Sequence, residues 1–130
     1  MRFWFRMDIG CWWAGAGWCA LLLLALPAVA AEHRCGWLDN PTPANLWLRD
    51  RDGEWTLSQQ GLYVAPGMDN LPRRRPSEWV VTNGTSYGYG CVCLRVELDR
   101  DTRNVLRVLS GTTLPLSRCR TDPKLPPMPG

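Results

Sequence analysis

The sequence predicts a small, mainly β protein: one antiparallel sheet domain held by two disulfides, following an N-terminal signal peptide. Three observations support this fold class. Short runs of alternating apolar and polar residues recur along the chain, turn-forming residues separate them, and four cysteines follow the apolar N-terminus. The sequence contains no internal repeat and no long helical pattern beyond that N-terminus.

The first thirty residues have the three parts of a secretory signal. Arg2 and Arg6 form a basic start, an uncharged stretch runs over residues 9–26, and Pro27 precedes small residues at 28–30. A retained membrane anchor is the alternative, because eighteen uncharged residues approach the length that spans a bilayer. Pro27 and the small residues after it favour cleavage after Ala30. We therefore expect residues 1–30 to be removed on export, with no stable membrane insertion afterwards.

The expected mature part, residues 31–130, is long enough for one domain with a modest core. It carries thirteen Lys and Arg against eleven Asp and Glu, a net charge of +2. Nucleic-acid surfaces usually form a concentrated basic face, so this charge argues against nucleic acid as a partner. The one basic run, Arg73, Arg74 and Arg75, stands between two prolines. It predicts an extended, solvated loop, with contact to an anionic partner as the alternative.

Four cysteines, Cys35, Cys91, Cys93 and Cys119, predict a disulfide framework for a domain over residues 31–120. Cys91 and Cys93 stand two apart in an extended, Val-rich run, so their side chains share one face and a bond between them would be strained. Each therefore reaches a distant partner, one to Cys35 and the other to Cys119, and the assignment stays open. Each bridge should contribute about 2–4 kcal/mol. Zinc binding is the alternative, disfavoured by the Cys-x-Cys spacing and by an oxidising compartment.

Two alternating runs, over residues 46–50 and 54–58, predict a β-hairpin. They flank Arg51-Asp52-Gly53, and an Asp-Gly pair favours a type I′ turn, in which both central residues have positive φ. With that pair at the centre of the turn, Arg51 would face Glu54 and form an ion pair with it.

The sequence of the rest of the domain predicts further antiparallel strands. We expect a short strand at 61–65, a loop at 66–76, a helical turn capped by Ser77 or a strand at 77–81, a turn at Asn83-Gly84, a strand at 91–98, its hairpin partner at 105–109, and a Pro-rich, disordered tail at 121–130. The strand at 91–98 is the clearest. Its apolar face consists of Val92, Leu94, Val96 and Leu98.

Four blocks in the mature chain match a known pattern. They are Cys-Gly-Trp-Leu-Asp-Asn-Pro-Thr-Pro-Ala-Asn (35–45), Asp-Arg-Asp-Gly-Glu-Trp-Thr (50–56), Thr-Asn-Gly-x-Ser-Tyr-Gly-Tyr-Gly-Cys-x-Cys-Leu (82–94) and Leu-Pro-Leu-Ser-x-Cys-Arg (114–120). Together they resemble a family of small exported bacterial proteins called domain of unknown function 4087. Thr85 departs from the pattern as one additional residue after Asn-Gly. The resemblance implies export to a Gram-negative periplasm and implies no activity.

Candidate catalytic residues are few. His33 is the only histidine and stands three residues into the expected mature chain, where a fixed imidazole for nucleophilic catalysis is uncommon. A calcium loop would need a longer run of oxygen ligands than the acidic residues around Gly53 provide, so these residues indicate a turn. Glu54, Glu78 and Glu97 are the carboxylates available for glycoside hydrolysis, but nothing in the sequence brings them together. We expect no catalytic residue, cofactor or metal.

The aromatic residues are the better candidates for recognition. They are Trp37, Trp47, Trp55, Trp79, Tyr63, Tyr87 and Tyr89. Most tryptophans of a small domain belong to its core, but Tyr87 and Tyr89 alternate with glycines that would leave their rings uncovered. Core packing and an exposed patch both remain open, and exposed aromatics are typical of interface hot spots. The candidate recognition surface is Tyr87 and Tyr89 with Arg73, Arg74 and Arg75.

These observations favour a non-enzymatic binding or interaction module over an enzyme. The partner class we expect is a periplasmic protein or an envelope component, and one version is an inhibitor or immunity protein for a wall-degrading enzyme. That version rests on size and compartment alone. The alternative is a cell-wall or glycan hydrolase that uses Asp and Glu carboxylates.

Overall fold

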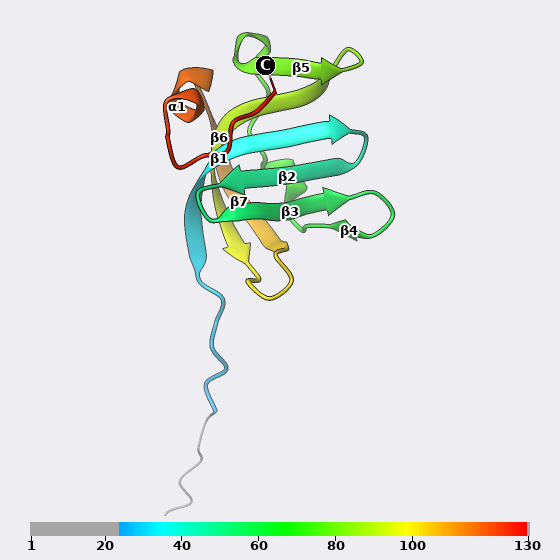
Figure 1. Ribbon diagram of the computed structural model, residues 1–130. Coiled ribbons are helices and arrows are strands. Elements are labelled where there is room, and N and C mark those ends of the chain that lie inside the picture. The colour runs from blue at the N-terminus through cyan, green and yellow to red at the C-terminus, as the bar shows by residue number, and fades with distance from the viewer. Residues whose placement is uncertain (1–23, 130) are drawn as a thin grey trace, which may run out of the picture.

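The structure is a computed structural model that describes residues 24–129 (Figure 1). The expected signal peptide over residues 1–30 therefore lies mostly outside the described residues, and residues 24–30 have no regular secondary structure. Within the described range, no helix combines the length and the hydropathy needed to cross a bilayer.

The described chain is mainly β, as the sequence predicts. Its elements in order are β1 (Ala31–Thr42), β2 (Asn45–Asp50), β3 (Gly53–Gln59), β4 (Tyr63–Val64), the 3-10 turns η1 (Met68–Asn70) and η2 (Pro76–Glu78), β5 (Trp79–Asn83), β6 (Tyr87–Leu98), β7 (Val105–Leu114) and the short helix α1 (Leu116–Arg120). The segment expected to be either a helical turn or a strand at 77–81 contains part of each, η2 followed by β5. The expected cap is wrong, since Ser77 lies inside η2 and Arg75 stands at its N-cap position.

All strands belong to one antiparallel sheet with the order β4-β3-β2-β1-β6-β5. The far side of β6 is shared: residues 87–90 pair with β5 and residues 91–98 pair with β7. The sheet curls, because Thr56 of β3 forms a bridge to Asn104 in the β6–β7 turn and its N–H donates to the carbonyl of Arg103 at 2.9 Å. Figure 1 shows β7 and the second half of β6 lying behind β2 and β3.

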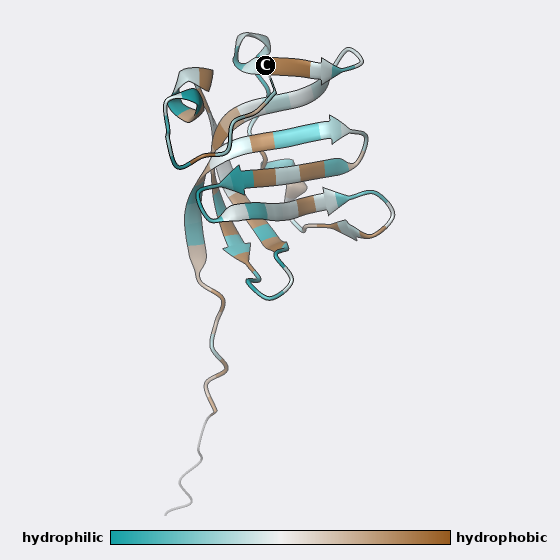
Figure 2. Cartoon of the chain, viewed as in Figure 1, coloured by the Kyte–Doolittle hydropathy of each residue, from teal (hydrophilic) through white to brown (hydrophobic). Residues whose placement is uncertain are grey.

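The main core fills the inside of this curl. Its fully buried side chains come from β2, β3, β6 and β7 and include Leu48, Trp55, Leu57, Leu94, Val96, Val105 and Val108. The alternation predicted for residues 91–98 is confirmed, since the four apolar residues of that face are all buried. Figure 2 shows this alternation of hydrophobic and hydrophilic residues along the strands, with hydrophilic turns between them.

A second, smaller cluster covers the other face of β1 and β6. It contains Trp37, Tyr89, Cys91, Leu116 and Cys119. Leu125 and Met128, from the tail expected to be disordered, pack against it. The difference has a physical reason: the tail begins at a covalently fixed cysteine and carries two apolar side chains that cover the aromatic rings.

Both disulfides have the long-range pairing that the sequence predicts, and the assignment is now resolved. Cys35 bonds Cys93 directly across β1 and β6, with Cα atoms 4.0 Å apart. Cys91 bonds Cys119, which fixes α1 to β6 with Cα atoms 5.8 Å apart. All four thiols are therefore engaged in covalent bonds, which removes the zinc alternative and indicates an oxidising, extracytoplasmic environment.

The predicted type I′ turn between β2 and β3 is wrong. Asp50 pairs with Gly53, so the two residues between them form the turn, and Asp52 does not have positive φ. The carboxylate of Asp50 accepts a hydrogen bond from the Asp52 N–H at 2.8 Å, which favours an Asx-type turn instead. Within this turn, from Asp50 to Gly53, only Gly53 has positive φ, at 115°. The ion pair of Glu54 consequently forms with Arg49, at 3.0 Å, and not with Arg51.

Candidate functional site

The candidate site lies around Trp79, the first residue of β5. The ring of Trp79 rests against the bare backbone of Gly90 in β6: a Cβ added to Gly90 would lie 2.9 Å from the ring atom Cε3. A Cβ added to Gly88 would lie 1.8 Å from the carbonyl oxygen of Val80. The glycines of the Tyr-Gly-Tyr-Gly run therefore allow β5 and its tryptophan to lie close against β6.

Arg74 covers this tryptophan from the loop that precedes η2. Its guanidinium carbon lies 4.2 Å from the centre of the Trp79 ring, a cation–π contact. The carbonyl of Ser86 accepts hydrogen bonds from Arg74 Nη1 and from Trp79 Nε1, both at 3.1 Å. Partial burial lowers the pKa of Arg74, whose guanidinium still remains charged. The loop, the edge strand and the β5–β6 turn are thus joined at one point.

A buried asparagine holds Arg74 in place. The side-chain oxygen of Asn40 accepts a hydrogen bond from Arg74 Nη2. The amide nitrogen of Asn40 donates to the carbonyls of Thr42, at 3.0 Å, and Asn45, at 2.6 Å. The irregular β1–β2 turn therefore fixes Asn40, and Asn40 orients the arginine above the tryptophan.

Beside the Arg74–Trp79 stack lies a hollow of about 230 Å³. Its lining consists of Arg74, Pro76, Trp79, Val81, Thr85 and Ser86. Val81 is 48% exposed although its side chain is apolar. Thr85, the additional residue of the turn, lies in the three-residue connection between β5 and β6 and forms part of this wall. Arg73 and Arg75 are exposed on the same loop as Arg74.

β5 forms one edge of the sheet, and its outer side is open. Among the described residues, β6 alone pairs with β5, and no turn or loop donates a backbone hydrogen bond to its other side. β5 also has no charged residue and no proline, the features that usually protect an edge strand. The opposite edge of the sheet, β4, is only two residues long.

The outer side of β7 is covered, in contrast to that of β5. The Val108 N–H donates to the carbonyl of Pro66 at 2.9 Å, and the Asn70 side chain donates to the carbonyl of Val108 at 3.0 Å. Further along, the Thr113 hydroxyl donates to the carbonyl of Arg73 at 2.8 Å. The loop from 66 to 73 therefore protects this edge.

The residues of the predicted recognition surface separate in the structure. Tyr89 is 2% exposed and packs edge-on against Trp37 with ring centres 5.2 Å apart, so it belongs to the core and not to an exposed patch. The reason is that its face of β6 is covered by α1 and the tail. Tyr87 is half-buried, while the three arginines are exposed. Arg74 is the member that joins the Trp79 site, and no pattern in the sequence indicated that Arg74 would pair with Trp79.

The carboxylates considered for hydrolysis each have a separate structural contact. Glu54 binds Arg49 at 3.0 Å, and Glu97 lies 3.6 Å from Arg107. Glu78 accepts a hydrogen bond from the N–H of Leu116 at 2.7 Å, at the start of α1. His33 is exposed on β1. In residues 24–129, no group of three or more His, Cys, Asp or Glu side chains is arranged to hold a metal ion.

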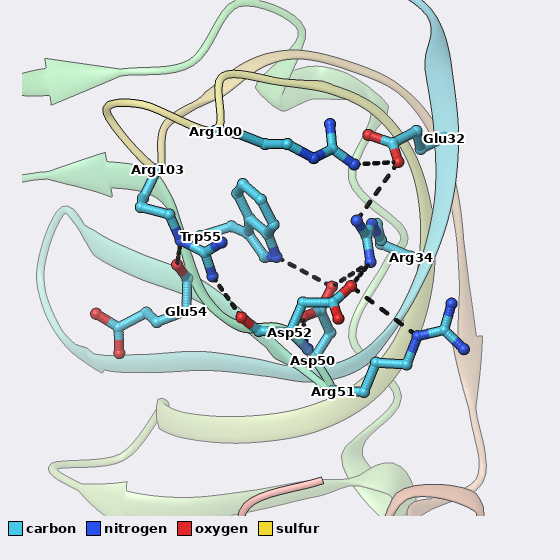
Figure 3. Close-up of polar contacts among 9 residues, drawn as sticks. All are labelled: Glu32, Arg34, Asp50, Arg51, Asp52, Glu54, Trp55, Arg100 and Arg103. Atoms are coloured by element: carbon cyan, nitrogen blue, oxygen red, sulfur yellow. Dashed lines mark hydrogen bonds and ion pairs between the residues drawn. The ribbon is translucent and has the colours of Figure 1, made fainter. Parts of the chain in front are cut away.

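A second polar cluster lies at the other end of the molecule, around Trp55 (Figure 3). Its buried cation is Arg34, which lies 3.5 Å from Asp50 and also donates to Asp52. Trp55 Nε1 donates to Asp50 at 3.0 Å, and the guanidinium of Arg103 lies 3.6 Å from the centre of the Trp55 ring. This cluster joins β1, the β2–β3 hairpin and the β6–β7 turn, so its role is to hold the curl of the sheet.

Two carboxylates at the rim of this cluster have lowered pKa values. The hydrogen bond from Arg100, at 2.7 Å, is the largest cause of the lowered pKa of Glu32. The hydrogen bond from Arg34 is the largest cause of the lowered pKa of Asp52. Both carboxylates are therefore ionised at neutral pH and paired with arginines, which is typical of structural ion pairs and not of an acid–base site.

A family model described as "Protein of unknown function (DUF4087)" matches residues 29–126 of the chain. No curated protein and no solved structure matches the chain. The matched range contains both disulfides, the Trp55 cluster and the Trp79 site. Because the match covers most of the sequence and includes the whole folded domain, the chain belongs to the DUF4087 family.

Proposed function

We propose that the protein is a non-enzymatic binding module that takes an extended segment of a partner protein against the open side of β5. One observation carries this proposal. β5 is an uncharged edge strand with an uncovered outer side, and it lies beside a hollow built from Trp79 and Val81. Addition of a strand to such an edge is an established mode of peptide recognition.

The chemistry of the site defines the segment that fits. Backbone N–H and C=O groups on the open side of β5 would pair with those of an extended chain, which gives affinity independent of sequence. The hollow beside Trp79 would take one apolar side chain of the segment. Arg74 lines that hollow, and Arg73 and Arg75 are exposed on the same loop. None of the three forms an ion pair among the described residues, so their charges favour an acidic neighbour in the segment.

The compartment narrows the partner class. Disulfide bonds persist in oxidising, extracytoplasmic environments, so we infer a partner that is a periplasmic protein or an envelope component. An inhibitor or immunity protein for an envelope enzyme is the version of this function in which the partner segment belongs to that enzyme. The Trp79 site supports binding and does not distinguish this version from other periplasmic partners.

The alternative, a glycan hydrolase, needs two carboxylates on either side of a scissile bond. Glu54, Glu78 and Glu97 lie on different elements and hold different partners, so the geometry gives this alternative no support. We expect that the purified protein leaves the turbidity of a cell-wall suspension unchanged. We also expect Glu54→Gln, Glu78→Gln and Glu97→Gln to behave like the wild type in that assay. The alternative would be established if the wild type lowered the turbidity of the suspension and one of these variants did not.

A displayed library of linear peptides tests the proposed function without a known partner. Peptides selected on the wild-type domain should bind Val81→Asp at least about tenfold more weakly, because the new carboxylate lies at an exposed position of the hollow and repels an acidic ligand. Trp79→Ala should have a similar effect, with near-UV circular dichroism to confirm that the variant is folded.

The matched control is Arg107→Ala, which removes an exposed arginine from β7, away from the hollow. It should bind the selected peptides like the wild type. Failure to enrich any peptide, or peptides that bind Val81→Asp and the wild type equally, would contradict the proposed function.

A further inference from the structure

The C-terminal tail is held firmly at its start. Cys119 is bonded to Cys91 in β6, the Asp122 N–H donates to the Cys119 carbonyl at 3.2 Å, and the Leu125 N–H donates to the Asp122 carbonyl at 3.2 Å. The Asp122 side chain also accepts a hydrogen bond from the Lys124 N–H at 2.9 Å. The tail thus leaves α1 in a fixed direction, across the face of the sheet that carries Trp37.

The second half of the tail is held in a different way. Among residues 126–129, one hydrogen bond joins the tail to the domain: the indole Nε1 of Trp37 donates to the carbonyl of Pro126 at 3.0 Å. No backbone N–H in the described part of this segment, 126–129, bonds the rest of the chain. Leu125 and Met128 supply the apolar contacts. The tail end is therefore attached by an indole N–H, two side chains and its prolines.

The tail lies over a groove whose aromatic surface is formed by Trp37 and Tyr89. Trp37 and Tyr89 meet edge to face at 86° with centres 5.2 Å apart. Both belong to β1 and β6, which pair with each other over most of their length, and a disulfide to α1 closes one end. Beside the tail remains a hollow of about 370 Å³, lined by the two aromatics, Arg120 and the tail's own Pro123, Pro126, Pro127 and Met128. The tail therefore does not fill the whole volume of the groove.

These contacts have the chemistry of proline-rich peptide recognition. A polyproline II segment has no internal hydrogen bonds, so its carbonyls are free to accept from an indole N–H, and its rings pack on aromatic faces. Its backbone is already stiff, so it loses little entropy on binding. Residues 122–125 of the tail form a hydrogen-bonded turn, and the part after this turn reads Pro-Pro-Met-Pro over 126–129, which is itself a Pro-x-x-Pro sequence.

We propose that the Trp37–Tyr89 groove is a binding site for proline-rich, extended segments of other proteins, and that the chain's own tail occupies it and competes with them. The tethered tail acts at an effective concentration on the order of millimolar, so an outside segment must displace it. The groove lies on the opposite face of β6 from the Trp79 ring. The groove and the β5 site bind different classes of ligand and are tested with different variants. An experiment can therefore contradict one proposal and leave the other standing.

The probe for this proposal is a capped synthetic peptide with the sequence of residues 122–129. The receiving protein is the full domain carrying Leu125→Ser and Met128→Ser, which weakens the tail and leaves both disulfides and the groove intact. This variant should bind the peptide at least about tenfold more tightly than the wild type does, since the competing tail is released. A peptide with alanine in place of Pro126 and Pro127 should bind more weakly than the native one.

A third substitution tests the indole donor. Trp37→Phe in the released-tail variant keeps an aromatic ring and removes the N–H, so it should weaken peptide binding about fivefold, the effect of one hydrogen bond. The proposal is overturned if the folded released-tail variant does not bind the native peptide, or if it binds the native and the alanine peptides equally.

A measurement on the unaltered domain covers the case in which the released-tail variant does not fold. The ¹³C-methyl signal of Met128 reports the position of the tail. Excess unlabelled peptide should shift it to the value of a solvated methionine while the Trp37 indole signal remains that of a hydrogen-bonded group. No change of the Met128 signal at millimolar peptide would overturn the proposal.

Discussion

Arg34 and Asp50 form a buried ion pair between β1 and the end of β2, with 9% and 1% of their side chains exposed and a closest N–O distance of 3.5 Å. The pair is also part of the Trp55 cluster, since Asp50 accepts from Trp55 Nε1. A buried carboxylate that loses its cation keeps the desolvation cost without the compensating attraction. This pair should therefore matter more for stability than the other ion pairs of the domain.

We predict that Arg34→Met lowers the free energy of unfolding by about 3–5 kcal/mol, because Asp50 stays buried without its partner. The matched control is Arg107→Met, which breaks an exposed pair with Glu97 and should cost less than about 1 kcal/mol. Denaturant unfolding of the oxidised domain measures both. Equal losses in the two variants would contradict the assigned role of Arg34.

The lowered pKa values of Glu32 and Asp52 predict how stability depends on acid. A carboxyl whose pKa is lower in the folded state stabilises the fold above its ordinary pKa, and this contribution is lost as the pH falls through the folded value. Stability should therefore fall as the pH decreases below about 4. Arg100→Met should make the decrease shallower, because it removes the largest cause of the lowered pKa of Glu32.

Carbon NMR titration of the Glu32 carboxyl checks this prediction directly. In the wild type its midpoint should lie below the ordinary value, and in Arg100→Met it should return toward that value. An unchanged midpoint in the variant would show that Arg100 does not set the pKa of Glu32.

The close approach of β5 to β6 predicts the effect of a single methyl group. Gly88→Ala places a Cβ against the Val80 carbonyl, and backbone atoms cannot move aside cheaply. We expect a loss of stability of about 1–3 kcal/mol and faster hydrogen exchange of the β5 amides. Thr112→Ala, at an exposed position of β7, should change the free energy of unfolding by less than about 0.5 kcal/mol. Unchanged β5 exchange in Gly88→Ala would contradict the packing described for this edge.

The two disulfides should have different local effects. Replacing Cys91 and Cys119 together by Ala should cost about 2–5 kcal/mol and speed hydrogen exchange in α1, because that bond is the helix's covalent link to β6. The pairing of β1 with β6 should keep its slow exchange. Peptide mapping without reduction checks the connectivity: a fragment that links Cys35 to Cys119 would contradict it.

Much of this fold follows from local sequence patterns. The strict alternation from Cys91 to Leu98 sets the two faces of β6, and the neighbouring cysteines on one face force long-range bridges. The β2–β3 turn shows where such reasoning stops. The Asp-Gly pair predicts one turn, but the carboxylate of Asp50 caps a different one, and that hydrogen bond depends on a side-chain position which spacing does not reveal.

The candidate site could be predicted only in part, because it too depends on side-chain positions that sequence spacing does not reveal. The sequence draws attention to Tyr87, Tyr89 and the arginine run, but burial of Tyr89 depends on a tail that folds back from α1. The Arg74–Trp79 stack depends on Asn40, more than thirty residues earlier in the chain. Contacts of this kind join residues that are distant in the sequence, so no local pattern indicates them.

Strand addition at the open side of β5 is the central claim, and alternately N-methylated forms of a selected peptide test it most directly. A strand paired on one side uses the N–H groups of alternate residues only. Of two peptides methylated at the two alternate sets, one should therefore bind like the parent and the other should not bind. The binding form should also slow hydrogen exchange in Trp79–Asn83. Equal binding by both methylated peptides, with no protection of β5, would contradict the account.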